Sequence, residues 1–199
     1  MFRSLFGGNK TSLIRQMGGS DNRQVLQAVE ALKKHGWFRD GSLHGVQLEN
    51  ANLQGAALAK ADMQQANLRG ANLTKAYLGE THLKAATLCH VQLCDANMRN
   101  VILVEADLSH ADLTRAYLPS AVLTNAKLIE AQLIGANFWQ ADLRAANLLN
   151  ALMTNVTLYE TQFDEQTILP DGTNWSSDID WGRFTDPNHP AFWRRTGSS

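Results

Sequence analysis

A period of five residues runs through the middle of the chain and limits what the chain can fold into. Every fifth position from 43 to 163 holds a large apolar residue: 20 leucines, three methionines and two phenylalanines. Two residues before each of these, the residue is small, and it is alanine in 18 of the 25 repeats. We number the repeat positions −2 (small), −1, 0 (large), +1 and +2.

This period fits neither a helix nor a flat strand. A helix turns by about 100° per residue, so leucines five apart would spread around its whole surface. In a flat strand, residues five apart point to opposite faces. The pattern is satisfied if the chain turns after every five residues and keeps positions −2 and 0 inside. One small and one large inward residue per side suit a narrow solid tube, because two large residues would clash and two small ones would leave voids.

Many repeats run alanine, then Asp or Asn, then leucine or methionine. Examples begin at Ala51, Ala61, Ala66, Ala71, Ala106, Ala111 and Ala141. These repeats resemble the A(D/N)LXX unit of the pentapeptide-repeat protein family, over residues 41–168. The resemblance implies an all-β solenoid, a right-handed quadrilateral β-helix of about six coils, in which residues 20 apart stack in columns.

Residues 1–40 are predicted to form an N-terminal segment with a capping helix over residues 21–35. Asp21 or Asn22 as N-cap and an apolar face indicate this helix, and Gly36 after it is a stop signal. The apolar face consists of Val25, Leu26, Val29 and Leu32. We expect Trp37 and Phe38 to lie as a lid over the first coil, and residues 1–20 to be partly mobile.

Residues 169–199 are predicted to form a tail that packs back on the rod. Pro170 and the Asp-Gly pair after it end the repeat frame, and five aromatic residues in this segment do not suit a solvated linker. We expect the tail to close the far end of the rod and to cover an outward apolar column formed by Ile129, Leu149 and Leu169. The tail-docking surface comprises these three residues with Trp175, Trp181, Phe184 and Trp193.

One side of the predicted rod carries outward aromatic residues, whose exposure to water needs a cause. The residues of this possible interaction surface are Tyr77, Tyr117, Pro119, Trp139 and Tyr159. Two explanations remain open for the outward apolar positions of the rod. Either the tail or the N-terminal helix covers them, or they bind a partner or a second copy of the chain.

No residue pattern indicates catalysis, a cofactor or a metal. The Asp residues at position −1 alternate with Asn, so the repeat explains their spacing, and no nucleophile, phosphate-loop or dinucleotide motif is present. His90 and His110 are 20 apart with Cys89 beside them, but the paired spacing of a zinc site is missing. Cys89 and Cys94 fall on adjacent sides of one coil, so we expect no disulfide between them.

The formal net charge of −1 excludes the strong basic field of a nucleic-acid binder, and no apolar run is long enough to span a membrane. The chain start lacks a secretory signal, so we expect a cytoplasmic location. The tail resembles the endings of bacterial pentapeptide-repeat proteins. We therefore expect a non-enzymatic, rod-like scaffold, monomer or dimer, that binds an unknown protein partner or itself through its outer faces or ends.

Two alternative functions stay open. The family resemblance implies that the rod could be a DNA mimic that binds a type II topoisomerase such as gyrase and gives quinolone resistance. This role needs a sustained negative face, whereas residues 41–168 hold 12 acidic residues against eight Lys and Arg. The second alternative is contact with a membrane surface through residues 1–40, which hold seven Lys and Arg against three acids, with Phe2, Leu5 and Phe6 as anchors.

Overall fold

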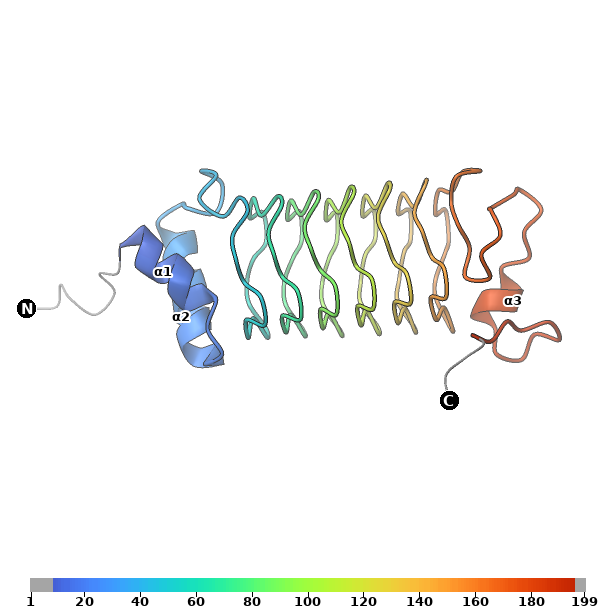
Figure 1. Ribbon diagram of the computed structural model, residues 1–199, viewed down its shortest axis with the longest axis horizontal. Coiled ribbons are helices and arrows are strands. Elements are labelled where there is room, and N and C mark those ends of the chain that lie inside the picture. Colours follow the sequence, from blue (N-terminus) through green and yellow to red (C-terminus); the bar gives the residue numbers. More distant parts are fainter. Residues whose placement is uncertain (1–8, 196–199) are drawn as a thin grey trace, which may run out of the picture.

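The computed structural model describes residues 9–195 and shows a straight rod with helices at one end and an irregular segment at the other (Figure 1). Helices α1 (Lys10–Met17) and α2 (Asn22–Lys34) precede the rod, and the short helix α3 (Gly182–Thr185) follows it. In this described part of the chain, no helix has the length and apolar character needed to cross a membrane.

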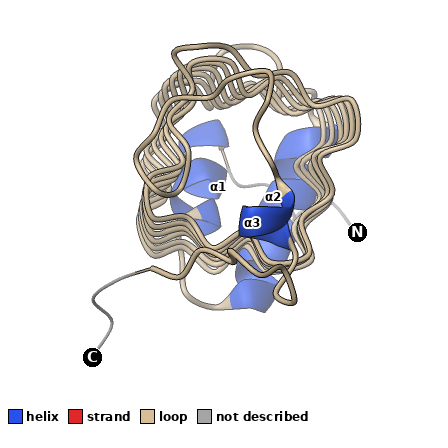
Figure 2. Cartoon of the chain, turned by 90° about the vertical axis from the view of Figure 1, so that its right-hand side faces the viewer, coloured by secondary structure: helices blue, strands red, loops and turns tan. Residues whose placement is uncertain are grey.

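The rod is a stack of coils of 20 residues each. Parallel bridges join residues at position −1 that are 20 apart, from Gln47 with Asn67 to Asp142 with Gln162. Four repeats therefore complete one coil, and the view along the rod shows a four-sided outline (Figure 2). We count six coils, of which the first is residues 41–60 and the sixth residues 141–160. Each side is named after its inward residue in the first coil: Leu43, Leu48, Leu53 or Leu58.

Each repeat ends in a tight turn. In the turn after Leu53, for example, the N–H of Ala56 donates to the Leu53 carbonyl over 2.9 Å. The residue at position +2 has a positive φ, between 54° and 69°, at every corner from Gly45 to Glu160. A positive φ at the third residue is the requirement of a type II turn. Most of these corner residues are not glycine, and the ladder stabilises them in this conformation, because their N–H donates to the next coil, as from Lys75 to the carbonyl of Cys94 at 2.9 Å.

The inward positions form one continuous apolar core. The alanines and leucines of the six coils are almost all fully buried, as the five-residue pattern predicts. Thr81, which replaces alanine at position −2, is also fully buried. Its hydroxyl donates to the carbonyl of Leu58 over 2.9 Å, so the buried polar group has a partner.

The repeat frame shifts by one residue after Phe163. Asn147 pairs with Ile168, which is 21 residues further along the chain, whereas the earlier bridges all join residues 20 apart. Thr167 and Leu169 consequently take the inward positions −2 and 0 of the next side, and both are fully buried.

The prediction that Leu169 stacks outward above Ile129 and Leu149 is therefore wrong. The additional residue before Thr167 turns Leu169 into the core, and Pro170 takes the outward position beside Leu149. The Pro170 carbonyl continues the ladder by accepting a hydrogen bond of 2.8 Å from the N–H of Asn150, a corner residue of the sixth coil.

Helices α1 and α2 close the first coil. Asp21 caps α2 by accepting hydrogen bonds from the N–H groups of Arg23 and Gln24. The apolar face of α2 is buried and consists of Val25, Ala28, Val29, Ala31 and Leu32. Residues 10–17 form α1, a helix that the sequence did not predict, and it buries Leu13 and Met17. The mobility expected of residues 1–20 stays a prediction, and residues 1–8 lie outside the described part.

Phe38 and Trp37 lie differently at this end. Phe38 is only 5% exposed, and its carbonyl accepts a hydrogen bond of 2.7 Å from the N–H of Asp62 in the second coil. Trp37 is half-buried at the rim, with its ring stacked on His35 at 4.5 Å and the Lys10 ammonium 5.1 Å from the ring centre. Phe38 thus belongs to the lid over the core, and Trp37 lies at its edge.

An aromatic cluster closes the other end. Phe163, the last inward aromatic residue of the regular frame, lies 4.6 Å from Trp181 and 6.3 Å from Trp175, measured between ring centres. Phe184 lies 6.2 Å from both Trp181 and Trp193 and is 2% exposed. The tail therefore packs against the last coil from Trp175 to Trp193.

Candidate interaction surface

The exposed large apolar residues of the described chain all lie on the Leu58 side of the rod. They are Tyr77, Tyr117, Trp139 and Tyr159, with exposed fractions of 58%, 42%, 41% and 65%. Tyr77 and Tyr117 occupy position −1 in the second and fourth coils. Trp139 and Tyr159 occupy position +1 in the fifth and sixth coils. Sequence reasoning placed these residues on one side, and the structure leaves them uncovered.

The backbone ladder fixes the direction of the two tyrosine side chains at position −1. Tyr77 donates its N–H to the carbonyl of Ala56 at 2.9 Å, and Tyr117 does the same with Ala96. Each ladder residue between two inward neighbours points outward, so the rings lie on a rigid frame instead of a mobile loop. Such fixed aromatic residues are what protein interfaces use, because little side-chain freedom is lost on binding.

Pro119 does not belong to the exposed surface, although sequence reasoning placed it there. It is buried in its outward column between Arg99 and Trp139. Its compact ring is shorter than these two neighbours, which stand one coil below and one coil above it. The structure instead adds residues that the aromatic pattern did not single out. They are Asn97 and Asn137 at position −1 and Gly79 and Arg99 at position +1.

Charged residues flank this side at its corners. Lys60 and Glu80 lie one above the other, 3.7 Å apart, and Gln140 donates to Glu160 over 2.6 Å. At the opposite corner, Arg115 forms a two-point ion pair with Asp95, with distances of 2.7 and 2.9 Å. Stacking by 20 residues brings these pairs together.

The tail reaches the column of Ile129 and Leu149 in part. Both residues are half-buried. The turn at Gly172 lies against Leu149, since a Cβ atom on Gly172 would be 3.4 Å from its Cδ1. Arg195 lies 3.5 Å from Glu130, the residue that follows Ile129. The aromatic residues expected to dock here close the end of the rod instead, around Phe163.

The acidic residues of the repeat have structural partners. Burial raises the pKa of Asp107, but hydrogen bonds from the hydroxyl and N–H of Ser109 outweigh this effect and hold the pKa below its ordinary value. The Arg144 side chain lowers the pKa of Asp142 in the same way. Both carboxylates are therefore ionised acceptors near neutral pH, which does not suit a general acid.

The two cysteines have the character of unreactive thiols. Both are free and half-buried. Burial raises the pKa of each thiol, that of Cys94 to about 11, and the neighbouring carboxylates of Asp107 and Asp112 add to this effect. The thiolate is the nucleophile and the metal ligand, so little of the reactive form is present at neutral pH.

His90 and His110 stack at one corner with ring centres 4.8 Å apart and planes 4° from parallel. The Nδ1 atom of His110 lies 3.5 Å from a carboxylate oxygen of Glu130. Residues 9–195 contain no group of three His, Cys, Asp or Glu side chains that could hold a metal ion. The lone pairs of the ring nitrogens lie in the ring planes, so two parallel, stacked rings do not direct them toward a common point.

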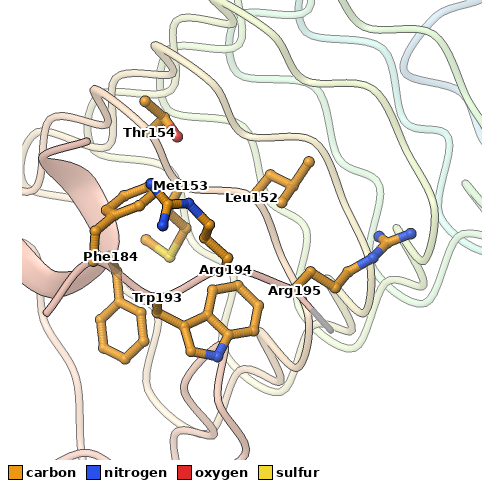
Figure 3. A pocket seen from close by; sticks show the side chains of 8 residues that line it. Leu152, Met153, Thr154, Phe184, Trp193, Arg194 and Arg195 are labelled. Carbon is orange, nitrogen blue, oxygen red and sulfur yellow. The ribbon is translucent and has the colours of Figure 1, made fainter. Parts of the chain in front are cut away.

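A half-open cavity of about 250 Å³ lies between the tail and the last coils (Figure 3). Met153, Phe184 and Trp193 form apolar walls, and Arg194 and Arg195 lie at its rim. Sequence reasoning missed this cavity because its two walls are far apart in the sequence. Arg195 is already close to Glu130, so one of the two cations is neutralised.

The model of the family described as pentapeptide repeats matches the chain in eight copies, over residues 42–79, 76–115, 102–140 and 131–165. No curated protein matches the chain.

Three solved structures illustrate what the chain is similar to. Rfr23, a pentapeptide repeat protein from the cyanobacterium Cyanothece 51142, is 33% identical over 44% of this chain and 63% of its own length, with a TM-score of 0.40. HetL, a pentapeptide repeat protein involved in heterocyst differentiation regulation in Nostoc sp. strain PCC 7120, is 30% identical over 66% of this chain and 76% of its own, with a TM-score of 0.26. QnrB1, a plasmid-mediated fluoroquinolone resistance protein, is 17% identical over 61% and 84%, with a TM-score of 0.36.

This chain thus spans 63% of the length of Rfr23. The family match runs from residue 42 to residue 165, which is more than half of the chain, and the same residues form the coils of the rod. The chain belongs to the family of pentapeptide-repeat proteins.

Proposed function

We propose that this protein is a non-enzymatic, cytoplasmic interaction protein, a right-handed quadrilateral β-helix that binds a protein surface through its Leu58 side. One observation carries the proposal: the four exposed large apolar residues of the described chain share this one side of the rod. A random distribution over four sides would rarely gather all four of them on one side.

The chemistry of the side supports a protein partner. Tyr and Trp combine a large apolar face with a polar group, and they dominate the binding energy of protein interfaces. The neighbouring Asn97, Asn137 and Arg99 supply polar groups between the rings. This mixture suits an interface that forms and dissociates. No part of the side is wholly apolar, so the side can also be exposed to water when no partner is bound.

The ends of the rod are less suited to binding. At the start, the N–H of Asn52 donates to Gly19 over 2.9 Å, and at the far end the N–H of Asn155 donates to Thr185 over 2.7 Å. These contacts occupy donors that a free sheet edge would offer to another chain. The Leu58 side therefore offers a partner more free contact groups than either end of the rod does.

The two alternative functions receive less support. A DNA mimic needs an unbroken negative face, whereas acids and cations alternate along the rod. Ion pairs between neighbouring coils include Glu49 with Arg69, Lys60 with Glu80, Lys84 with Glu105 and Asp95 with Arg115. The proposed membrane anchors Phe2, Leu5 and Phe6 lie outside the described residues.

Capture of partners from the source cells tests the proposal. One variant carries serine at the four exposed aromatic positions, and a matched control carries serine at four exposed residues of the other sides. These control residues are His82, Gln92, Lys127 and Gln132. We expect native protein and control to capture the same partner, and the aromatic-to-serine variant to lose at least about tenfold, since hot-spot residues carry most of the binding energy.

Recovery of the same proteins with all three forms would contradict the proposal. A gyrase supercoiling assay is run in parallel on native protein and on the aromatic-to-serine variant. Equal inhibition by both forms would mean that the rod acts on gyrase without using the Leu58 side.

A further inference from the structure

The Leu58 side has a regular arrangement that permits a match with itself. Its position −1 column reads Ala57, Tyr77, Asn97, Tyr117, Asn137 and Thr157 from the first to the sixth coil. Its position +1 column reads Ala59, Gly79, Arg99, Pro119, Trp139 and Tyr159. In both columns, small residues stand in the first coil, and in the second column the large rings stand at the far end.

A two-fold axis can place this side against the same side of a second copy. If the axis crosses the side at right angles to the rod, the two rods are antiparallel, and each column faces its own counterpart in reverse order. An axis between the third and fourth coils pairs the first coil with the sixth, the second with the fifth and the third with the fourth. This register overlaps all six coils.

In this register the large residues of one copy face small or amide residues of the other. Tyr159 faces Ala59, and Trp139 faces Gly79. In the other column, Tyr77 faces Asn137 and Tyr117 faces Asn97. Large rings therefore meet space or a flat amide instead of another ring, which is the size complementarity that close packing requires.

The corner charges are complementary in the same register. Lys60 in the first coil faces Glu160 in the sixth, and Glu80 faces the neutral Gln140. At the other corner, the Asp95 and Arg115 pair lies in the third and fourth coils, next to the axis. Asp95 of each copy there faces Arg115 of the other copy. No two like charges therefore face each other across the corners.

The charges at the ends of the rod favour antiparallel over parallel rods. The described N-terminal segment, residues 9–40, holds six Lys and Arg against three acids. Parallel rods would bring two such cationic segments together. Antiparallel rods place each of them beside the tail of the other copy, whose described residues 169–195 have four acids against three arginines.

We infer that the surface bound by the Leu58 side is the Leu58 side of a second copy of this chain, in an antiparallel two-fold dimer centred between the third and fourth coils. The inference rests on the proposed function and names its partner. The side is about 29 Å long, at ~4.8 Å per coil. We expect a reversible dimer with a dissociation constant on the order of micromolar.

Sedimentation equilibrium on the full chain, from about 1 to 200 μM, tests the dimer. We expect the average mass to rise from monomer to dimer across this range. Trp139→Ser shifts the midpoint to higher concentration by about tenfold, because the indole ring that packs on Gly79 of the second copy is removed. Lys127→Ser, an exposed position −1 residue on the Leu48 side, leaves the midpoint unchanged.

A charge swap tests the register. Lys60→Glu and Glu160→Lys each weaken the dimer by roughly threefold to tenfold, because each occurs twice in a symmetric interface. The double variant restores native dimerisation, since the pair is reversed across the interface. Lys84→Glu, which breaks a similar surface pair with Glu105 on the Leu43 side, has no effect.

The outcomes separate this inference from the proposed function. A monomer throughout the range overturns the dimer, and if the aromatic-to-serine variant still loses a captured protein, the Leu58 side binds a different partner. A dimer that the double variant fails to restore overturns the register. A dimer insensitive to Trp139→Ser and to both charge variants overturns the inference and removes the support for the Leu58 side as well.

Discussion

At the scale of the residue, Asp and Asn before the leucine have a hydrogen-bonding reason. From Glu49 to Tyr159, no backbone carbonyl accepts a hydrogen bond from the N–H at position +1. Asp or Asn at position −1 supplies the missing acceptor, as Asn147 does for the N–H of Leu149 at 3.0 Å. The same contact forms at nine of the ten Asp and Asn residues of this position. They are Asn52, Asn67, Asn72, Asn97, Asp107, Asp112, Asn137, Asp142 and Asn147.

Replacement of Asn147 tests this role. Asn147→Ala leaves the partly buried N–H of Leu149 without its protein acceptor, so we expect a loss of about 0.5–1.5 kcal/mol in the free energy of unfolding. Gln132→Ala is the control, because Gln132 holds the same repeat position and is exposed. Urea unfolding of both variants, followed by circular dichroism, measures the difference. Equal losses in the two variants would show that the side-chain acceptor adds no stability.

At the scale of the element, one carboxylate replaces the hydrogen-bond acceptor that is lost where the repeat frame shifts. In a regular coil the corner N–H donates to a backbone carbonyl of the next coil, as from Gly55 to Thr74. At Ala145 this carbonyl is displaced by the additional residue, and the N–H donates instead to the side chain of Asp164 at 2.8 Å. Asp164 also accepts from the N–H of Gln166 and the hydroxyl of Thr167. A side chain has thus taken the place of a main-chain group.

Asp164→Ala is therefore expected to destabilise the last coil. It removes the acceptor of the Ala145 N–H, and one unsatisfied donor costs about 1–3 kcal/mol. Asp164→Asn keeps a carbonyl oxygen at the same place and is expected to recover more than half of the loss. Thermal unfolding of the native protein and the two variants measures this order. If Asp164→Asn is as unstable as Asp164→Ala, the charge of the carboxylate stabilises the last coil, and its role as a hydrogen-bond acceptor does not.

The same elements show what the sequence could and could not predict. The inward and outward positions follow from the five-residue period and packing alone, whereas the coil of 20 residues, which places the aromatic residues on one side, was implied by the family resemblance. The frame shift was not predictable, because Leu169 continues the apparent column of Ile129 and Leu149 and only the bridge from Asn147 reveals the slip. Helix α1 was missed because it is eight residues long, too short to show a clear period. Tertiary contacts of Leu13 and Met17 stabilise it instead.

At the scale of the whole molecule, the rod is a one-dimensional stack held between two different caps. Each coil contacts only its neighbours, so stability at one end depends weakly on the other end. The helical cap buries Leu32 and Met17, and the tail buries Phe184 among Trp181 and Trp193. Because both ends are closed, the sides of the rod are its accessible surface. The capping of the fold is therefore consistent with the proposed binding through the Leu58 side.

Removal of one buried side chain from each cap tests whether the ends act independently. Phe184→Ala leaves a cavity in the tail cluster and is expected to cost about 3–5 kcal/mol in local stability. Amide hydrogen exchange should then quicken at least about 100-fold in the sixth coil and stay unchanged in the first. Leu32→Ala, its counterpart in α2, should give the reverse pattern. Faster exchange along the entire rod in either variant would instead show that the six coils open as one cooperative unit. The loss of stability at one cap would then lower the stability of every coil.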